Sequence, residues 1–189
     1  MSPWRTSGRL RAVGLVAAGC ALGVAITLVG GARADRSRDP SALVTAGQLA
    51  RAEHRKVDLL LERGDVDGAL AALTQALDAP WPGPDRAGAA VVPLRHDLVG
   101  RWARLALDHR GAGAPSPSPA QVRRRLLAEL GDAPADAAPD PFTARLWALL
   151  GEAYEADGQD DEALAAYQKA LDMNRALLDA LLTEEDGAP

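Results

Sequence analysis

The chain has 189 residues and a formal net charge of −5, and only 4% of its residues are aromatic. Strand-forming residues are scarce, so the composition indicates an all-α protein with one small domain and appendages. The single cysteine, Cys20, excludes an intrachain disulfide. Beyond residue 38 the chain holds 15 basic and 25 acidic side chains, and this acidic balance argues against a nucleic-acid partner.

The first feature in chain order is an uncharged apolar stretch, residues 12–32, with three arginines before it and three after it. Its length fits the roughly 20 apolar residues of a helix that crosses a bilayer. We interpret residues 1–34 as an uncleaved signal anchor. Two alternatives stay open: a secretory signal peptide cleaved after Ala34, and a lipoprotein signal that ends at Cys20.

The signal anchor predicts where the protein works. It would place the chain in the cytoplasmic (inner) membrane of a bacterium as a single-pass protein, with its soluble part on the periplasmic or extracytoplasmic side. Cleavage near Ala34 would instead release a secreted protein. Residues 35–40 then form a short polar linker to the soluble part.

Two helical regions come after the linker. Residues 41–83 show apolar residues at helical spacing on both sides of Gly64, which predicts a hairpin of two helices. Residues 84–141 predict two further helices, at 91–110 and 120–130, with Pro- and Gly-rich loops after each of them.

The most regular pattern lies in residues 142–182. Within residues 144–177, apolar residues recur at helical spacing on both sides of a Gly-containing turn, and Asp160 can cap the second helix. The residues that define the pattern are Trp147, Leu150, Gly151, Tyr154, Gly158, Ala163, Tyr167 and Ala170. We expect a final helix at 175–182 to cap the open end, and residues 183–189 to form an acidic tail.

The stretch 144–177 resembles a tetratricopeptide repeat, whose pattern is W-x2-L-G-x2-Y, a glycine turn, and A-x3-F followed by a later alanine. Tyr167 replaces the phenylalanine, and Arg175 stands where the family has a proline. Residues 50–83 look like a degenerate copy of the repeat. When the two turn glycines are aligned, the matching residues of the copy are Gly64, Ala69, Leu73 and Ala76.

The resemblance implies an all-α fold of stacked antiparallel helical hairpins, with residues 84–141 in the place of a middle repeat. It also implies that ligands lie in a groove lined by the first helix of each repeat. In the last repeat the groove-facing positions are Arg145, Ala148, Glu152, Glu155 and Ala156. In the degenerate repeat they are Arg51, His54, Asp58, Leu61 and Glu62.

Four carboxylates would line this groove: Asp58, Glu62, Glu152 and Glu155. We therefore expect partner proteins that offer basic or amphipathic peptide segments.

No pattern in the sequence indicates catalysis. The histidines at positions 54, 96 and 109 form no metal-binding pair, and nucleotide-binding and nucleophile motifs are missing. We therefore predict no enzyme, no catalytic residue, no cofactor and no metal. The predicted function is a protein-interaction scaffold or adaptor at the bacterial cell envelope.

Two other functions stay open. One is an accessory factor for envelope assembly or maturation, because membrane-anchored tetratricopeptide proteins of cytochrome c maturation have a similar layout. The other is a structural protein whose repeats self-associate.

Overall fold

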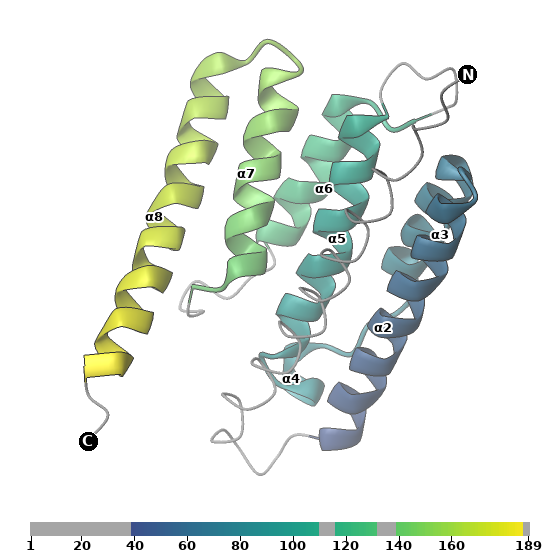
Figure 1. Ribbon diagram of the computed structural model, residues 1–189, viewed down its shortest axis with the longest axis horizontal. Coiled ribbons are helices and arrows are strands. Elements are labelled where there is room, and N and C mark those ends of the chain that lie inside the picture. Colours follow the sequence, from purple (N-terminus) through teal and green to yellow (C-terminus); the bar gives the residue numbers. More distant parts are fainter. Residues whose placement is uncertain (1–38, 110–115, 132–138, 187–189) are drawn as a thin grey trace, which may run out of the picture. The chain divides into compact units, whose positions relative to one another are not determined.

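The computed structural model describes residues 39–109, 116–131 and 139–186, and their regular structure is entirely helical (Figure 1). The helices are α2 (Pro40–Glu62), α3 (Val66–Asp78), α4 (Pro84–Ala87), α5 (Val91–Asp108), α6 (Pro119–Gly131), α7 (Pro141–Glu155) and α8 (Asp160–Asp186). The prediction of an all-α fold is confirmed for these residues. The predicted helices of the middle region, 91–110 and 120–130, agree with α5 and α6 within two residues at each end.

The chain separates into two units, Met1–Arg38 and Asp39–Pro189. The predicted signal anchor, with its span at 12–32 and its two alternatives, lies outside the described residues. Among the helices of the described part, none combines the length and the apolar character that crossing a membrane requires.

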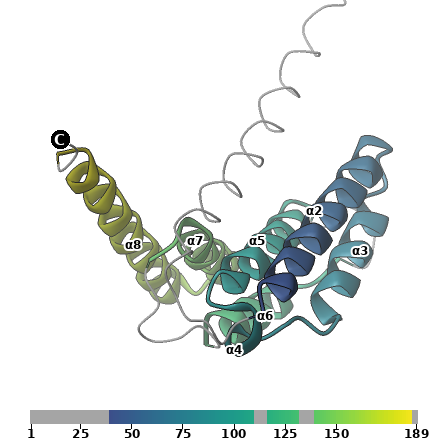
Figure 2. The same cartoon turned by 90° about the horizontal axis from the view of Figure 1, so that it is seen from below.

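Six of the helices form three pairs that stack side by side. The pairs are α2–α3, α5–α6 and α7–α8, and each pair packs against the next (Figure 1). Helix α5 contacts both α2 and α3, and α7 contacts both α5 and α6. The first helices of the pairs, α2, α5 and α7, therefore lie next to one another in chain order (Figure 2).

Local sequence signals set the boundaries of these helices. The carboxylates of Asp65 and Asp140 accept hydrogen bonds from backbone amides in the first turns of α3 and α7. Gly64 and Gly158 form the turns inside the first and last pairs, with φ of 75° and 70°. This left-handed conformation is cheap only for glycine, so each turn ends its first helix at a defined position.

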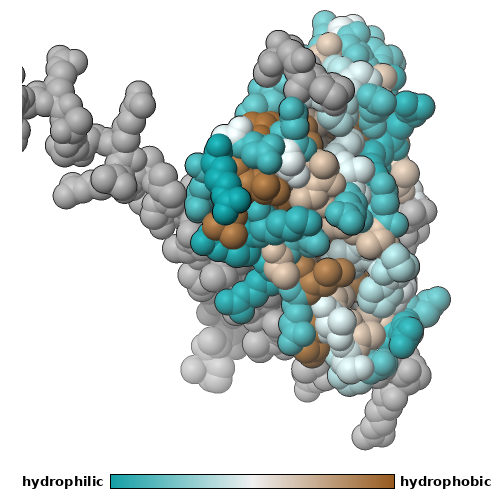
Figure 3. All heavy atoms as spheres, turned by 90° about the vertical axis from the view of Figure 1, so that its right-hand side faces the viewer, coloured by the Kyte–Doolittle hydropathy of each residue, from teal (hydrophilic) through white to brown (hydrophobic). Residues whose placement is uncertain are grey.

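One apolar core runs through all three pairs and fixes how they stack. It joins leucines of every pair to Trp102 of α5. The largest fully buried apolar side chains are Leu73, Leu77, Leu98, Leu126, Leu146, Leu149, Leu150, Val57, Val99 and Val122. On the outer side of α2 and α3, by contrast, hydrophobic residues are interspersed among hydrophilic ones (Figure 3).

The prediction of a separate capping helix at 175–182 is wrong. Helix α8 continues without a break from Asp160 to Asp186, so these residues are its C-terminal part. The physical reason is the residue at position 175. Arginine is a good helix former, and it stands where the family has a proline that would stop the helix.

Candidate protein-interaction surface

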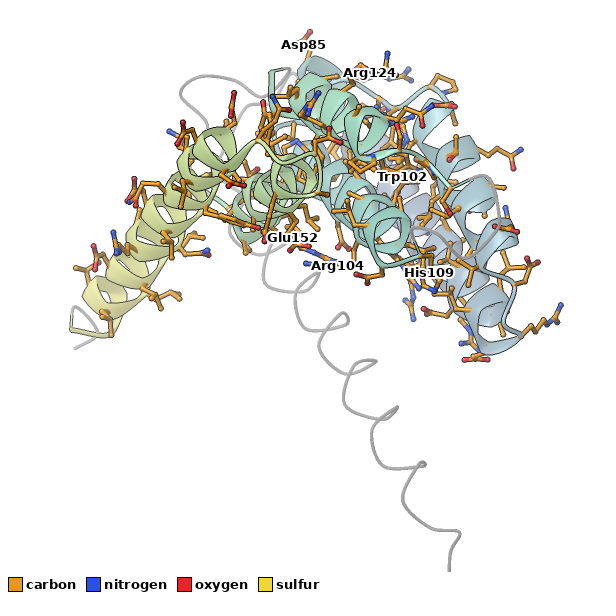
Figure 4. The ribbon with its side chains drawn as sticks, turned by 90° about the horizontal axis from the view of Figure 1, so that it is seen from above. Asp85, Trp102, Arg104, His109, Arg124 and Glu152 are labelled. Atoms are coloured by element: carbon orange, nitrogen blue, oxygen red, sulfur yellow. The ribbon has the colours of Figure 1, made fainter. Side chains whose placement is uncertain are left out.

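The exposed sides of α2, α5 and α7 form the surface that the groove prediction concerns, and we call it the A-helix face. Helix α5 supplies its centre through Asp97, Arg101, Arg104 and Asp108, which are spaced four, three and four residues apart. Residues at this spacing lie along one side of a helix. Figure 4 shows Arg104 and Glu152 pointing toward each other from α5 and α7.

Ion pairs connect α2 to α5 across this face. Arg101 pairs with Asp58 and also donates a hydrogen bond of 3.1 Å to the backbone oxygen of His54. The Nε2 atom of His54 lies 3.0 Å from a carboxylate oxygen of Asp97. The first and middle helix pairs are therefore held together by polar contacts outside the apolar core.

A second set of ion pairs connects α5 to α7. Arg104 donates two hydrogen bonds of 2.6 Å to the two carboxylate oxygens of Glu152. This hydrogen bonding raises the pKa of the Arg104 guanidinium above its usual value. Arg145 lies 3.5 Å from the second oxygen of Asp97, so Asp97 contacts both outer helices of the face. The A-helix face therefore carries acidic and basic side chains that pair with each other between its helices.

These contacts change how the predicted groove residues are understood. The expected row of four carboxylates is interrupted, because arginines of α5 neutralise Asp58 and Glu152. Glu62 pairs with Arg55 of its own helix at 3.5 Å, and Glu155 accepts a hydrogen bond of 2.9 Å from Tyr167.

The apolar groove positions take no part in these ion pairs. Ala148, Ala156 and Leu61 are half-buried, and Leu61 packs against the core. A role of any of these residues in partner binding stays a prediction.

Sequence reasoning missed the charges of α5. The resemblance gives no groove positions in residues 84–141, because this region lacks the residues that identify a repeat. The signal that could have revealed them is the spacing of Asp97, Arg101, Arg104 and Asp108 along one side of a predicted helix.

A shallow cavity of about 240 Å³ lies elsewhere, between the Trp81–Pro84 segment and helices α5 and α6. His96 lines it and is almost fully buried, with its Nδ1 atom 2.8 Å from the hydroxyl of Thr143. Burial lowers the pKa of His96 below its usual value. Within the described residues, no group of three His, Cys, Asp or Glu side chains is placed to hold a metal ion.

The geometry defines a class: an all-helical protein of stacked helix pairs whose first helices share one exposed face. Comparison with protein families identifies one of the helix pairs, because residues 144–177 match the tetratricopeptide repeat. The resemblance is confirmed, and the chain carries a tetratricopeptide repeat formed by α7 and the first part of α8. Comparisons with curated proteins and with solved structures gave no match.

The residues that carry the repeat pattern lie where α7 and α8 meet. Leu150, Gly151, Ala163 and Ala170 are buried between the helices. A Cβ atom at Gly151 would lie only 2.6 Å from the ring of Tyr167, so the close approach of the two helices requires a glycine there. Trp147, Tyr154 and Tyr167 are half-buried.

Proposed function

We propose that this chain is a non-catalytic scaffold that binds segments of partner proteins on its A-helix face. The tetratricopeptide repeat supports this proposal, because proteins with this repeat are in general interaction modules. The observation that carries it is that α7 of the repeat shares one face with α5 and α2, connected by the pairs Arg104–Glu152 and Arg101–Asp58. Such connections hold the face in one arrangement, which lowers the entropy lost when a partner binds.

The paired charges also indicate the chemistry of the partner segment. A purely basic segment would find few unpaired carboxylates, because Asp58 and Glu152 are already paired with arginines. An amphipathic segment fits better. Its own acidic and basic side chains can pair with the charges of the face, while its apolar side lies against Ala148 and Leu61.

We further propose that the scaffold works at the bacterial cell envelope, anchored by residues 12–32. The uncharged apolar stretch and its flanking arginines support this location. Fractionation of cells that express the full-length chain is the test. We expect the protein in the membrane fraction, where sodium carbonate does not extract it, and an N-terminus that retains residue 1. A soluble chain that begins near residue 35 would contradict anchoring.

The binding face is tested by an Ala148→Arg variant of the full-length chain, crosslinked in intact cells and analysed by mass spectrometry. Ala148 is half-buried on α7 and takes part in none of the ion pairs, so a long side chain there covers the face while every residue of the ion pairs is kept. The matched control is Ala71→Arg, an exposed position on the second helix of the first pair. We expect partner proteins to be lost in Ala148→Arg and kept in the control. An unchanged set of partners in Ala148→Arg would contradict the proposal.

A further inference from the structure

The outer side of the last helix, α8, carries a row of exposed leucines. Leu164, Leu171 and Leu178 succeed one another at intervals of seven residues, and Leu182 comes four residues later. At this spacing they lie along one side of the helix, and we call them the α8 leucine stripe. Their side chains are 50–66% exposed. An apolar row of this kind on a soluble surface marks an interaction site.

In the first helix pair, the leucines that correspond to this stripe are covered by a neighbouring helix. When the turn glycines Gly64 and Gly158 are aligned, Leu70 and Leu77 of α3 take the positions of Leu164 and Leu171. Leu70 and Leu77 are only 6% and 2% exposed, because they lie in the core shared with α5 of the next pair. Helix α8 offers the same leucines at the end of the stack, and no helix of the described residues covers them. The α8 leucine stripe therefore has the leucine pattern that a neighbouring helix covers in α3.

The charges around the stripe indicate what kind of helix fits. Residues 160–183 hold five acidic and two basic side chains, a net charge of −3. In the first pair, arginines of the following helices contact the C-terminal end of α3. Arg125 of α6 forms an ion pair with Asp78 at 2.9 Å, and Arg95 of α5 donates a hydrogen bond of 3.3 Å to the backbone oxygen of Leu77. The counterpart of Asp78 in α8 is Asp172, which contacts Gln168 and Arg175 of its own helix.

We propose that the α8 leucine stripe docks a basic amphipathic helix from a partner protein, in the way that α5 covers α3. The stripe runs from Leu164 to Leu182, a distance of 18 residue steps or about 27 Å along the helix, which sets the length of the partner helix at about five turns. A second copy of the chain fits poorly, because pairing two α8 helices would bring two net negative charges of −3 together. The inference rests on the proposed function only in treating the chain as a protein-binding scaffold, and it assigns a second binding surface.

The probe is a fluorescent synthetic peptide of 20 residues with leucines along one side of a helix and lysines elsewhere. A second peptide carries the same leucines with glutamates in place of the lysines. Both are titrated, by fluorescence anisotropy, against the full-length chain in nanodiscs of neutral lipid, and empty nanodiscs give the background. We expect binding of the lysine peptide and at least tenfold weaker binding of the glutamate peptide. Equal binding of the two peptides would overturn the proposal.

Variants locate the binding on α8. We expect Leu171→Ser/Leu178→Ser to weaken binding of the lysine peptide at least tenfold. The matched control, Val44→Ser/Leu127→Ser, removes exposed apolar side chains from other helices and should change binding less than twofold. Since all four side chains are exposed, circular dichroism should show intact helices in both variants. Unchanged binding in Leu171→Ser/Leu178→Ser overturns the proposal.

Three further outcomes separate this proposal from its alternatives. A wild-type dimer that dissociates in Leu171→Ser/Leu178→Ser would show that a second copy covers the stripe. A crosslink from position 178 to residues 1–38 of the same chain would show that this segment covers it. Either result overturns the proposal. Unchanged binding of the lysine peptide to the Ala148→Arg variant supports docking on the α8 leucine stripe. This conclusion holds whether or not Ala148→Arg loses the partner proteins of the A-helix face.

Discussion

The first and last helix pairs of this protein use the same turn and the same buried alanines, yet the chain continues differently beyond each pair. After α3 ends at Asp78, a proline follows at position 80. The indole of Trp81 then donates a hydrogen bond of 2.9 Å to the backbone oxygen of Ala76. The chain then turns back to form α5. In α8 no such break occurs, and the helix runs for 27 residues. The comparison shows that burial of the leucines on the second helix of a pair depends on the neighbouring helix, not on the pair itself.

The sharpest test of this comparison is to truncate counterpart leucines. Leu77→Ala should lower the free energy of unfolding by about 3 kcal/mol, because it opens a cavity in the core. Leu171→Ala, at the same position in α8, should lower it by less than about 0.5 kcal/mol because this side chain is half exposed. Urea denaturation of the full-length chain measures both. Equal losses would show that α8 is covered in the folded protein.

Substitutions at the contact between the two helices of a pair should have the next largest effect on the free energy of unfolding. The last pair combines Gly151 with Tyr167, whereas the first pair has Val57 and Leu73 at the same positions. Gly151→Val should lower the free energy of unfolding by about 2 kcal/mol, because the added atoms meet the Tyr167 ring.

A second substitution checks this reason. Gly151→Val/Tyr167→Leu recreates the combination of the first pair and should recover at least half of the loss in the same denaturation experiment. If the double variant is less stable than Gly151→Val, the two helix pairs do not share one packing rule.

The joint between the middle and last pairs should make stability depend on pH. The joint between the middle and last pairs contains buried His96, near Arg95, Glu129 and Asp140. The pKa of His96 in the folded state lies below 6.5, the ordinary value of a histidine. The unfolded chain therefore binds more protons than the folded chain, and the free energy of unfolding falls as the pH drops below about 6.5.

The expected loss is at most about 1.4 kcal/mol per pH unit, the limit for one proton. Urea denaturation between pH 7.5 and 5.5 should therefore show a steeper loss for the wild type than for His96→Gln. Identical pH dependence in the two proteins would rule out His96 as the cause.

The ion pairs of the A-helix face should contribute least to the free energy of unfolding. Arg104→Gln should cost less than about 1 kcal/mol, because Arg104 and Glu152 are 42% and 31% exposed and water screens their attraction. The cost should shrink further in high salt. Arg55→Gln is the control, since its pair with Glu62 lies within α2 and connects no helices. A larger cost for the control would mean that the ion pairs between helices do not hold the face together.

The turn glycines and the small residues between helices could be predicted from the sequence, because each is required by local geometry. Gly158 sits at a left-handed turn and Gly151 at a close approach, and both belong to a recognisable spacing. The long α8 was less predictable. The sequence shows that the proline is missing at Arg175, but the leucines after it fit a separate capping helix as well as they fit one continuous helix.

The paired charges of the A-helix face could not be predicted in the same way. They depend on which side of α5 lies between α2 and α7, and this is decided by the packing of Leu98, Trp102 and their neighbours across the pairs. Nor does a single sequence show which leucines have a covering helix. Leu77 and Leu171 stand in equivalent local patterns, and only the stack distinguishes them.

The central claim, that the chain binds partner proteins through its A-helix face, is tested most directly by photocrosslinking in living cells. A photoreactive amino acid is placed at position 148 of the full-length chain, with position 71 as the control. We expect crosslinks from position 148 to segments of other proteins that position 71 does not give. The same products from both positions, or products that contain only this chain, would contradict it.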